Sequence, residues 1–288
     1  MTTPVVTSFF DEATNNITYV VADPETGECA IIDPLLDYDA ASGRTATTFA
    51  DRVADFVRSE GLKVVWIIDT HIHADHLSAG HYLREILGGK LGIGSHISTV
   101  QKVFGALFNA DADFRLDGSQ FDHLFADGET YQVGNLSATA IHTPGHTPAC
   151  MTHVIGDAAF VGDTLFMPDY GTARCDFPGG DARALYNSIQ KLFALPDETR
   201  VFLNHDYLPE GRESYVWETT IGEQKRWNIH VHEGISEDEF VAMRTKRDAT
   251  LAMPKLIIPS VQVNMRAGEL PPPESNGVRY IKVPVDTL

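Results

Sequence analysis

The chain has 288 residues, of which 43% are hydrophobic and 22% charged, the composition of a folded globular protein rather than a disordered one. Its 40 acidic residues outnumber its 22 Lys and Arg and give a formal net charge of -18, so nucleic acid and anionic membrane surfaces are not expected partners. An anionic small substrate would need a local basic pocket to offset this overall charge.

The amino-terminal sequence and the cysteines favour a cytoplasmic location for the protein. The amino terminus has no basic stretch followed by an apolar core, and no apolar run is long enough to cross a bilayer. Cys29, Cys150 and Cys175 are odd in number and far apart, which fits free thiols in a reducing compartment. A homodimer is the default expectation for assembly.

The first third of the chain predicts alternating strands and helices. Apolar residues 17–21 and 30–32 flank a Pro- and Gly-containing turn at 23–27, which predicts a β-hairpin. Helical spacing of apolar residues predicts a helix at 45–60 that ends before Gly61. The β-branched run 63–69 predicts a strand buried on both faces, followed by a helix at 78–87 and a strand beginning near residue 90.

The rest of the chain continues this α/β pattern without a repeat or a dividing linker. Strands are predicted at 137–141, 151–155, 158–161 and 200–203. Helices are predicted at 181–194, 213–227 and 236–246, and the Pro-rich end around 271–273 predicts an extended strap.

The most informative motif is Thr70-His71-Ile72-His73-Ala74-Asp75-His76, directly after the predicted strand 63–69. Imidazole and carboxylate groups are ligands for zinc, iron or manganese. His71 and His73 are two apart on an extended segment and project to one side, while Asp75 and His76 can reach back from the following turn. A solvated polar loop is the alternative, but 12 histidines in 288 residues seldom place three so close together. Such a loop can serve one metal ion or two.

Three later junctions between a strand and a loop supply further ligands. They are the segments His142-Thr143-Pro144-Gly145-His146-Thr147, Gly162-Asp163-Thr164-Leu165-Phe166 and Leu203-Asn204-His205-Asp206-Tyr207. In open α/β sheets, loops at the carboxyl ends of strands carry the chemistry.

Taken together, the HxHxDH run, His146 in a TPGHT loop, Asp163 in a GDTLF loop and His205 resemble the metallo-β-lactamase superfamily over residues 15–210. The resemblance implies an αββα sandwich, in which two mixed sheets pack face to face with helices outside and the metal at one edge. We expect residues 1–288 to form a single domain, with 211–288 as a helical and extended carboxyl-terminal segment packed on it.

Within that superfamily, four segments resemble the persulfide dioxygenases, also called ETHE-type sulfur dioxygenases. They are THIHADHLSAGHYLRE, ARCDF at 173–177, HDY at 205–207 and NMRAGE at 264–269. The resemblance implies a non-haem enzyme with one Fe²⁺ per chain that converts glutathione persulfide, O2 and water to glutathione and sulfite. It places the iron ligands on His71, His146 and Asp163, a two-histidine, one-carboxylate set that leaves three coordination sites open.

The same resemblance assigns roles around the iron. His73, Asp75, His76, His205 and Tyr207 are expected to act in catalysis by orienting ligands, water or substrate.

Three side chains are candidates for substrate binding, namely Arg174, Tyr207 and Arg266. A guanidinium such as that of Arg174 can hold a glutathione carboxylate with two parallel hydrogen bonds. Cys175 departs from the family pattern, which is closer to GRTDF, and we interpret it as a small buried side chain rather than a reactive thiol.

Two other interpretations stay open. A zinc-dependent glutathione thioester hydrolase, similar to glyoxalase II, would use the same ligands, with a metal-bound hydroxide as nucleophile. The chain lacks the AGRxFEG-type segment and the basic carboxyl-terminal stretch of that family. A metal-binding sensor without turnover would share the fold but would not need open coordination sites. Residue spacing does not decide between one iron and two zincs.

Overall fold

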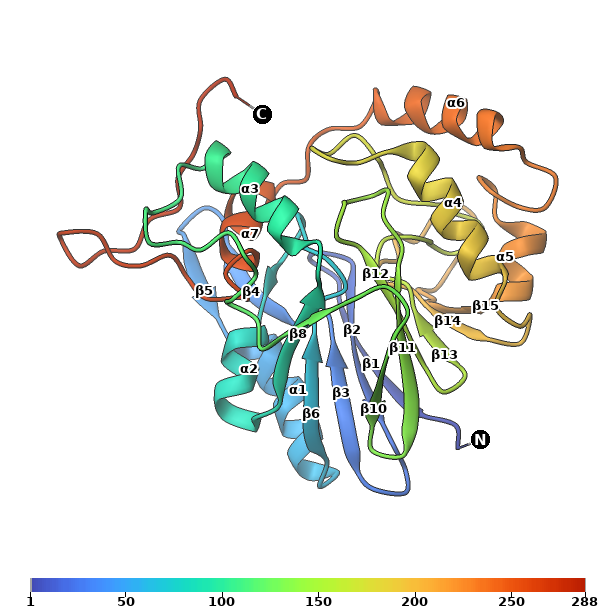
Figure 1. Cartoon of the computed structure of the whole chain (residues 1–288), viewed down its shortest axis with the longest axis horizontal. Coiled ribbons are helices and arrows are strands. Elements are labelled where there is room, and N and C mark those ends of the chain that lie inside the picture. Colours follow the sequence, from blue (N-terminus) through green and yellow to red (C-terminus); the bar gives the residue numbers. More distant parts are fainter. Residues whose placement is uncertain (1, 288) are drawn as a thin grey trace.

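The computed structural model describes residues 2–287 and contains two six-stranded sheets packed face to face (Figure 1). The first sheet consists, in spatial order, of β1 (Val5–Asp11), β2 (Asn16–Ala22), β3 (Glu28–Ile32), β6 (Lys63–Ile68), β8 (Lys90–Gly94) and β9 (His123–Phe125). Its first three strands are antiparallel, and β3, β6, β8 and β9 run parallel. The sheet is therefore mixed.

The second sheet consists of β10 (Glu129–Val133), β11 (Leu136–His142), β12 (Met151–Ile155), β13 (Ala158–Phe160), β14 (Arg200–Phe202) and β15 (Glu218–Thr220). It is also mixed, because β13 and β14 are parallel while the other neighbours are antiparallel. A small third sheet joins β5 (Arg44–Ala46), β4 (Leu35–Asp39) and β7 (Leu77–Ser78).

Helices cover the outer faces of both large sheets. The helices are α1 (Thr48–Ser59), α2 (Gly80–Leu87), α3 (Ile97–Leu107), α4 (Ala182–Phe193), α5 (Ile221–Trp227), α6 (Glu237–Asp248) and α7 (Ile257–Asn264). One apolar cluster lies between the sheets, a second joins the first sheet to α1, α2, α3 and α7, and a third joins the second sheet to α4, α5 and α6. These four layers confirm the expected αββα sandwich.

Several predicted elements are confirmed. β2 and β3 form the expected hairpin, and α1 ends before Gly61, whose φ of 64° lies in the left-handed region. Two predicted helix starts are wrong. The helix expected from residue 78 begins at Gly80, because Leu77–Ser78 pairs with β4 as β7. The helix expected from residue 213 begins at Ile221, because Glu218–Thr220 pairs with β14 and Thr220 then caps α5.

The chain beyond residue 210 contacts both sides of the sandwich. Ile221, Val231 and Phe240 lie in the cluster beneath the second sheet, whereas Val261 and Met265 lie in the cluster beneath the first. This carboxyl-terminal part is therefore in a position to support loops from both sheets.

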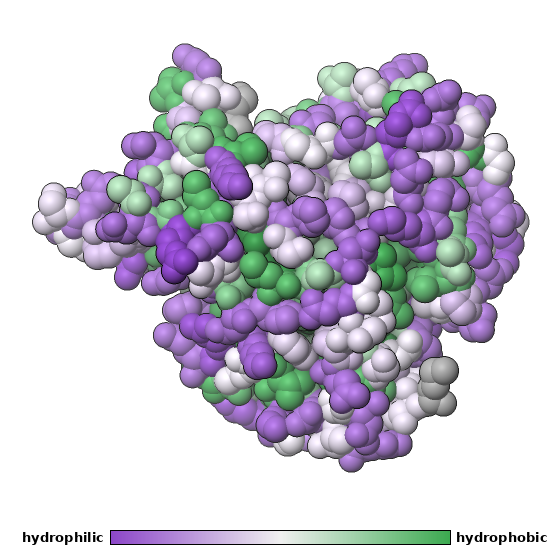
Figure 2. Space-filling view, viewed as in Figure 1, coloured by the Kyte–Doolittle hydropathy of each residue, from purple (hydrophilic) through white to green (hydrophobic). Residues whose placement is uncertain are grey.

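The surface is predominantly hydrophilic in the view of Figure 2, with hydrophobic residues in small separate areas. Within residues 2–287, the helices are all too short or too polar to cross a membrane.

Candidate metal centre

The predicted ligand loops meet at one edge of the sandwich. His71 follows β6, His146 follows β11, Asp163 follows β13 and His205 follows β14. All four residues are buried. The parallel strand ends and the facing sheets thus bring together side chains that lie up to 134 positions apart (205 minus 71) in the sequence.

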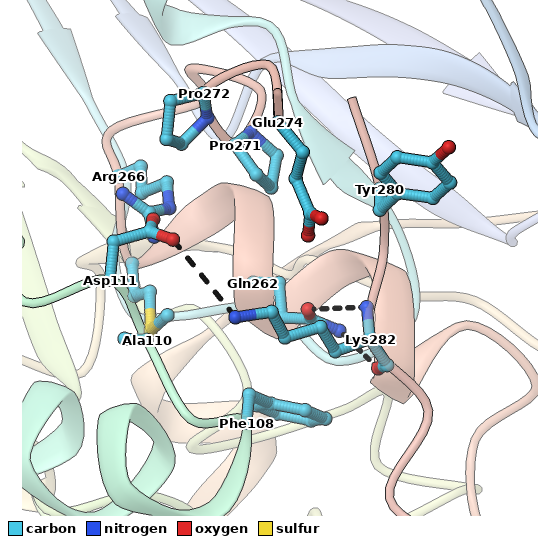
Figure 3. Close-up of a pocket in the computed structure, with 11 residues that line it drawn as sticks. Phe108, Ala110, Asp111, Gln262, Arg266, Pro271, Pro272, Glu274, Tyr280 and Lys282 are labelled. Atoms are coloured by element: carbon cyan, nitrogen blue, oxygen red, sulfur yellow. Dashed lines mark hydrogen bonds and ion pairs between the residues drawn. The ribbon is translucent and has the colours of Figure 1, made fainter. Parts of the chain in front are cut away.

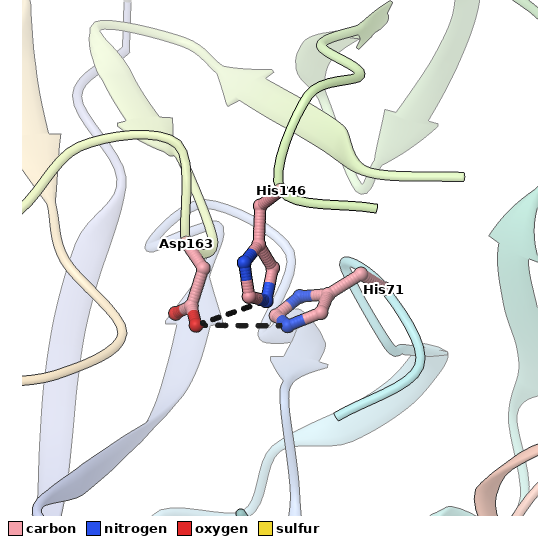
Figure 4. Close-up of side chains that lie close together, drawn as sticks. All are labelled: His71, His146 and Asp163. Atoms are coloured by element: carbon pink, nitrogen blue, oxygen red, sulfur yellow. Dashed lines mark ion pairs between the residues drawn. The ribbon is translucent and has the colours of Figure 1, made fainter. Parts of the chain in front are cut away.

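His71, His146 and Asp163 form one set of potential metal ligands (Figure 4). Asp163 Oδ2 lies 3.5 Å from His146 Nε2 and 3.8 Å from His71 Nε2. One ligand atom from each residue lies within 4.8 Å of the other two. His71 Nε2 and Asp163 Oδ1 are buried and have no hydrogen-bond partner within residues 2–287. Because buried polar atoms are rarely left unpaired, this set fits a bound metal ion.

Hydrogen bonds fix the tautomers of the two histidines. His146 Nδ1 donates to the carbonyl oxygen of Arg174 at 2.8 Å. Thr70 Oγ1 donates to Asp33 Oδ2 at 2.8 Å and therefore accepts from His71 Nδ1 at 3.0 Å. Each imidazole consequently directs the lone pair of Nε2 toward Asp163, which is the form that binds a metal.

A second set of potential metal ligands lies beside Asp163 and consists of His73, Asp75, His76 and His205. His76 Nδ1 contacts Asp75 Oδ2 at 3.0 Å, and His205 Nε2 lies 3.4 Å from both Asp75 Oδ2 and Asp163 Oδ1. His73, Asp75 and His76 also have ligand atoms within 4.8 Å of one another. The centre therefore has enough donors for a second metal ion.

The charge states of His71, His73 and Asp75 suit a cation. Burial lowers the pKa of His71 and of His73 well below the ordinary value, and neighbouring imidazoles add to the effect, so both rings stay neutral. Burial opposes ionisation of Asp75, but His205 and His76 outweigh it and hold the pKa of that carboxyl well below its usual range. Neutral imidazoles and a charged carboxylate are the forms that coordinate metals.

Asp33 is a buried member of the site that the sequence analysis did not identify. Its carboxylate accepts hydrogen bonds from the Thr70 amide at 2.6 Å, from Thr70 Oγ1 and from His73 Nε2 at 2.9 Å. The last of these bonds leaves the lone pair of His73 Nδ1 free to bind a metal ion. Asp33 directly follows β3, so its place at the carboxyl end of a strand was a clue available in the sequence.

Arg174 lies beside the centre with its guanidinium already paired. Nε and Nη2 donate to the two carboxylate oxygens of Asp176 at 2.6 and 2.7 Å, and Nη1 donates to the Ala252 carbonyl at 2.6 Å. The guanidinium carbon also lies 5.0 Å from the ring centroid of Phe177. The side chain has the geometry of a carboxylate clamp, and in this structure it holds a carboxylate of its own chain.

The loop that carries Arg174 is held by the carboxyl-terminal segment. Arg244 Nη1 donates to the Thr172 carbonyl at 2.9 Å, and the Cys175 amide donates to Asp248 at 2.9 Å. Arg244 and Asp248 form a buried ion pair with each other at 2.6 Å. Cys175 is itself buried, and burial raises the pKa of its thiol, as expected for a packed side chain.

Tyr207 lies in an aromatic cluster at the centre. Its ring centroid is 5.5 Å from that of His205, 5.8 Å from Phe166 and 4.9 Å from Tyr170. Burial raises the pKa of Tyr207 well above 10.0, and the carboxylates of Asp163 and Asp75 raise it further. The hydroxyl therefore stays protonated beside these acids. Tyr170, which the sequence analysis did not identify, extends the same aromatic surface.

Arg266 lies in a different environment from Arg174. Its Nη2 donates to Asp111 at 2.9 Å, and its guanidinium stacks 4.3 Å from the ring centroid of Phe114. It lines a pocket together with Gln262 and Lys282 (Figure 3). Among the described residues, Asp111 is the hydrogen-bond partner of its side chain, so Arg266 is not brought into contact with the ligand set.

Comparison with known proteins finds relatives whose names include a metallo-hydrolase and a glyoxylase. The sequence profile of the Metallo-beta-lactamase superfamily matches residues 12–205. A probable metallo-hydrolase of Burkholderia pseudomallei (strain 1710b) is 57% identical over 98% of this chain and 99% of its own length. Glyoxylase B2 of Dictyostelium discoideum is 49% identical over 93% of this chain and 92% of its own. This chain spans 66% of a longer relative, a beta-lactamase hydrolase-like protein of Xylella fastidiosa (strain Temecula1) that is 54% identical over 99% of this chain.

More distant relatives carry the name of a dioxygenase. The mitochondrial persulfide dioxygenase ETHE1 of Bos taurus is 32% identical over 92% of this chain and 89% of its own length. The crystal structure of ETHE1 from Myxococcus xanthus matches with a TM-score of 0.72 and 31% identity, covering 92% of this chain and all of the other.

Proposed function

The chain belongs to the metallo-beta-lactamase superfamily, and from this premise we propose that it is a persulfide dioxygenase with one ferrous iron per chain. Its substrates are glutathione persulfide and O2, and it works in the cytoplasm, where its three buried cysteines stay free. The iron ligands in this proposal are His71, His146 and Asp163.

The observation that carries the proposal is the composition of the ligand set His71, His146 and Asp163. Two imidazole nitrogens and one carboxylate form the facial set of non-haem iron oxygenases, which leaves coordination positions open for substrate and oxygen. The segments ARCDF, HDY and NMRAGE, together with persulfide dioxygenases of about one third identity over nine tenths of the chain, support the same assignment.

The proposed reaction balances as glutathione persulfide plus O2 plus water giving glutathione plus sulfite and two protons. The sulfur–sulfur bond breaks, the outer sulfur gains two oxygens from O2 and one from water, and the inner sulfur leaves as the thiol. Bound iron supplies the electron transfer that lets a closed-shell persulfide react with O2.

The protein residues act in this proposal through position. His73, Asp75, His76 and His205 lie beside the ligand set, where they orient ligands, water or substrate. Arg174 holds a glutathione carboxylate in place of Asp176, and the Tyr207 hydroxyl donates a hydrogen bond to the substrate. Arg266 is the weaker substrate-binding candidate, since its partner is Asp111.

A zinc-dependent glutathione thioester hydrolase is the second candidate, and a specific observation favours it. His73 Nδ1, His76 Nε2 and His205 Nε2 are all buried without a hydrogen-bond partner in residues 2–287, so they can complete a second metal site. The names metallo-hydrolase and Glyoxylase B2 of two relatives agree with hydrolysis by a metal-bound hydroxide.

Two assays on one preparation discriminate between the candidates. Apo-protein is reconstituted anaerobically with ferrous iron or with zinc, and its metal content is measured. Each form then receives glutathione persulfide in an oxygen electrode and a glutathione thioester in a hydrolysis assay. Iron-dependent oxygen uptake supports the dioxygenase, whereas thioester hydrolysis by the zinc form without oxygen uptake by the iron form supports the hydrolase.

A further inference from the structure

We propose that Asn264, the last residue of α7, is a positioning residue that sets the geometry of the 70–76 ligand loop and so the affinity and coordination of the metal ion. The inference rests on the metal-dependent function proposed above. It assigns a role at the centre to a helix that lies almost two hundred positions further along the chain.

The side-chain amide of Asn264 bonds the backbone at three points, two in the ligand loop and one in β7 directly after it. Its Nδ2 donates to the carbonyl oxygens of His73 at 2.9 Å and of His76 at 2.8 Å. Its Oδ1 accepts from the amide of Ser78 at 2.7 Å. Asn264 is 1% exposed, so water cannot replace these bonds.

These bonds fix the backbone of His73 and His76, whose side chains belong to the second set of potential metal ligands. The His73 side chain is held by Asp33 at 2.9 Å, so this residue is fixed at both its imidazole and its carbonyl. The His76 carbonyl is fixed while its imidazole contacts Asp75. Because His71 lies only two residues before His73, a shift of the loop also moves a proposed iron ligand.

The surrounding contacts hold Asn264 rigidly against the loop. α7 packs against β7, which follows directly after His76. Ser78 Oγ in turn donates to both oxygens of the buried Asp69 at 2.9 and 3.0 Å. Just after α7, Gly268 has a φ of 84°, and a Cβ there would lie 2.6 Å from the Ser78 carbonyl oxygen. The chain therefore passes the loop at a distance that only glycine allows.

The same helix offers a matched control. Gln262, 3% exposed, also clamps backbone with its amide: Nε2 donates to the Lys282 carbonyl at 2.9 Å, and Oε1 accepts from the Lys282 amide at 2.9 Å. Gln262 thus ties α7 to the carboxyl-terminal strap, whereas Asn264 ties it to the ligand loop. Loss of either amide should lower the unfolding temperature, but only loss of Asn264 should alter the metal site.

The test compares Asn264→Ala and Asn264→Asp with Gln262→Ala in the full chain. Each apo-protein is titrated with Co²⁺ alone against a competing chelator, and the visible absorption of bound Co²⁺ reports its coordination. We expect the Asn264 variants to bind Co²⁺ about 10- to 100-fold more weakly, the usual effect of losing a group that orients ligands, and to show a changed spectrum. Gln262→Ala should keep the wild-type affinity and spectrum.

The inference is overturned if the Asn264 variants keep the wild-type affinity and spectrum, or if Gln262→Ala changes them equally. Should the Asn264 variants not fold, hydrogen exchange of the wild-type protein replaces them. Co²⁺ should then slow exchange at amides 261–265 and leave amides 280–283 unchanged, and equal or absent protection overturns the inference. Wild-type protein that binds Co²⁺ but consumes no oxygen with iron would contradict the proposed function alone.

Discussion

Asp163 lies where both sets of donors meet, since its carboxylate is within 3.8 Å of His71, His146 and His205. We predict that Asp163→Ala removes iron retention and oxygen uptake together, because one of three protein ligands is lost. Metal analysis after gel filtration and an oxygen electrode measure both. Asp113→Ala, at an exposed acid, is the control and should retain both properties. Full iron content in the Asp163 variant would disprove the ligand assignment.

Arg174 should affect substrate affinity more than turnover. Arg174→Lys keeps the charge but loses the planar pair of donors that now holds Asp176, so we expect KM for glutathione persulfide to rise about tenfold with kcat little changed. Asp176→Asn is the matched variant. It releases the guanidinium and should leave KM unchanged or lower it. A fall in kcat with constant KM in the Lys variant would assign Arg174 to the chemical step instead.

His153, buried between the sheets, should make the fold sensitive to acid. Burial lowers its pKa to about 4, and its Nδ1 pairs with the Tyr131 hydroxyl at 2.9 Å. In the unfolded chain the same imidazole titrates near 6.5. As the pH falls from about 6.5 to 4, the unfolded state therefore takes up a proton that the folded state refuses, and the free energy of unfolding falls by up to about 1.4 kcal/mol per pH unit.

The variant His153→Gln, which cannot take up that proton, should show a flatter dependence of stability on pH in this range. Urea unfolding of the apo-protein at several pH values measures the slope, and His81→Gln, at a half-buried surface position, serves as control. Equal slopes in wild type and His153→Gln would show that folding does not shift the pKa of His153.

Among the structural elements, α6 contributes the buried ion pair that holds the 172–175 loop. Removal of one partner, in Arg244→Met, leaves the Asp248 carboxylate buried and unpaired and should lower the free energy of unfolding by about 3–5 kcal/mol. The double variant Arg244→Met with Asp248→Leu should recover most of this loss, because no charge is left buried. Denaturant unfolding of both variants measures the difference, and equal losses would contradict this account of the pair.

Elements with strong local patterns could be predicted from the sequence, and elements that depend on distant partners could not. Helical spacing of apolar residues indicated α1 and α4, and turn residues indicated the hairpin of β2 and β3. β15 has three residues and forms because Thr219 pairs with Val201 of β14. α7 was not predicted, and it contains Pro259 at its third position, where proline is compatible with the first helical turn.

For the whole molecule, the candidate ligands could be proposed from the sequence because each lies in a recognisable motif at the end of a strand. The roles of their supporting groups could not be identified in this way. Asp33 follows a predicted strand and Asn264 begins the NMRAGE segment, but what each side chain binds is set only when the fold brings it to Thr70, His73 and His76. Nor could the sequence show that Arg174 would be paired with Asp176, since that contact depends on side-chain geometry.

The most direct test of the central claim is the stoichiometry of the reaction by protein carrying one ferrous iron per chain. Oxygen consumed and sulfite formed are measured together after addition of limiting glutathione persulfide, with the zinc-loaded protein as control. The account predicts one sulfite for each O2 consumed and no uptake by the zinc form. Iron-loaded protein that forms no sulfite, or that consumes no oxygen, would contradict it.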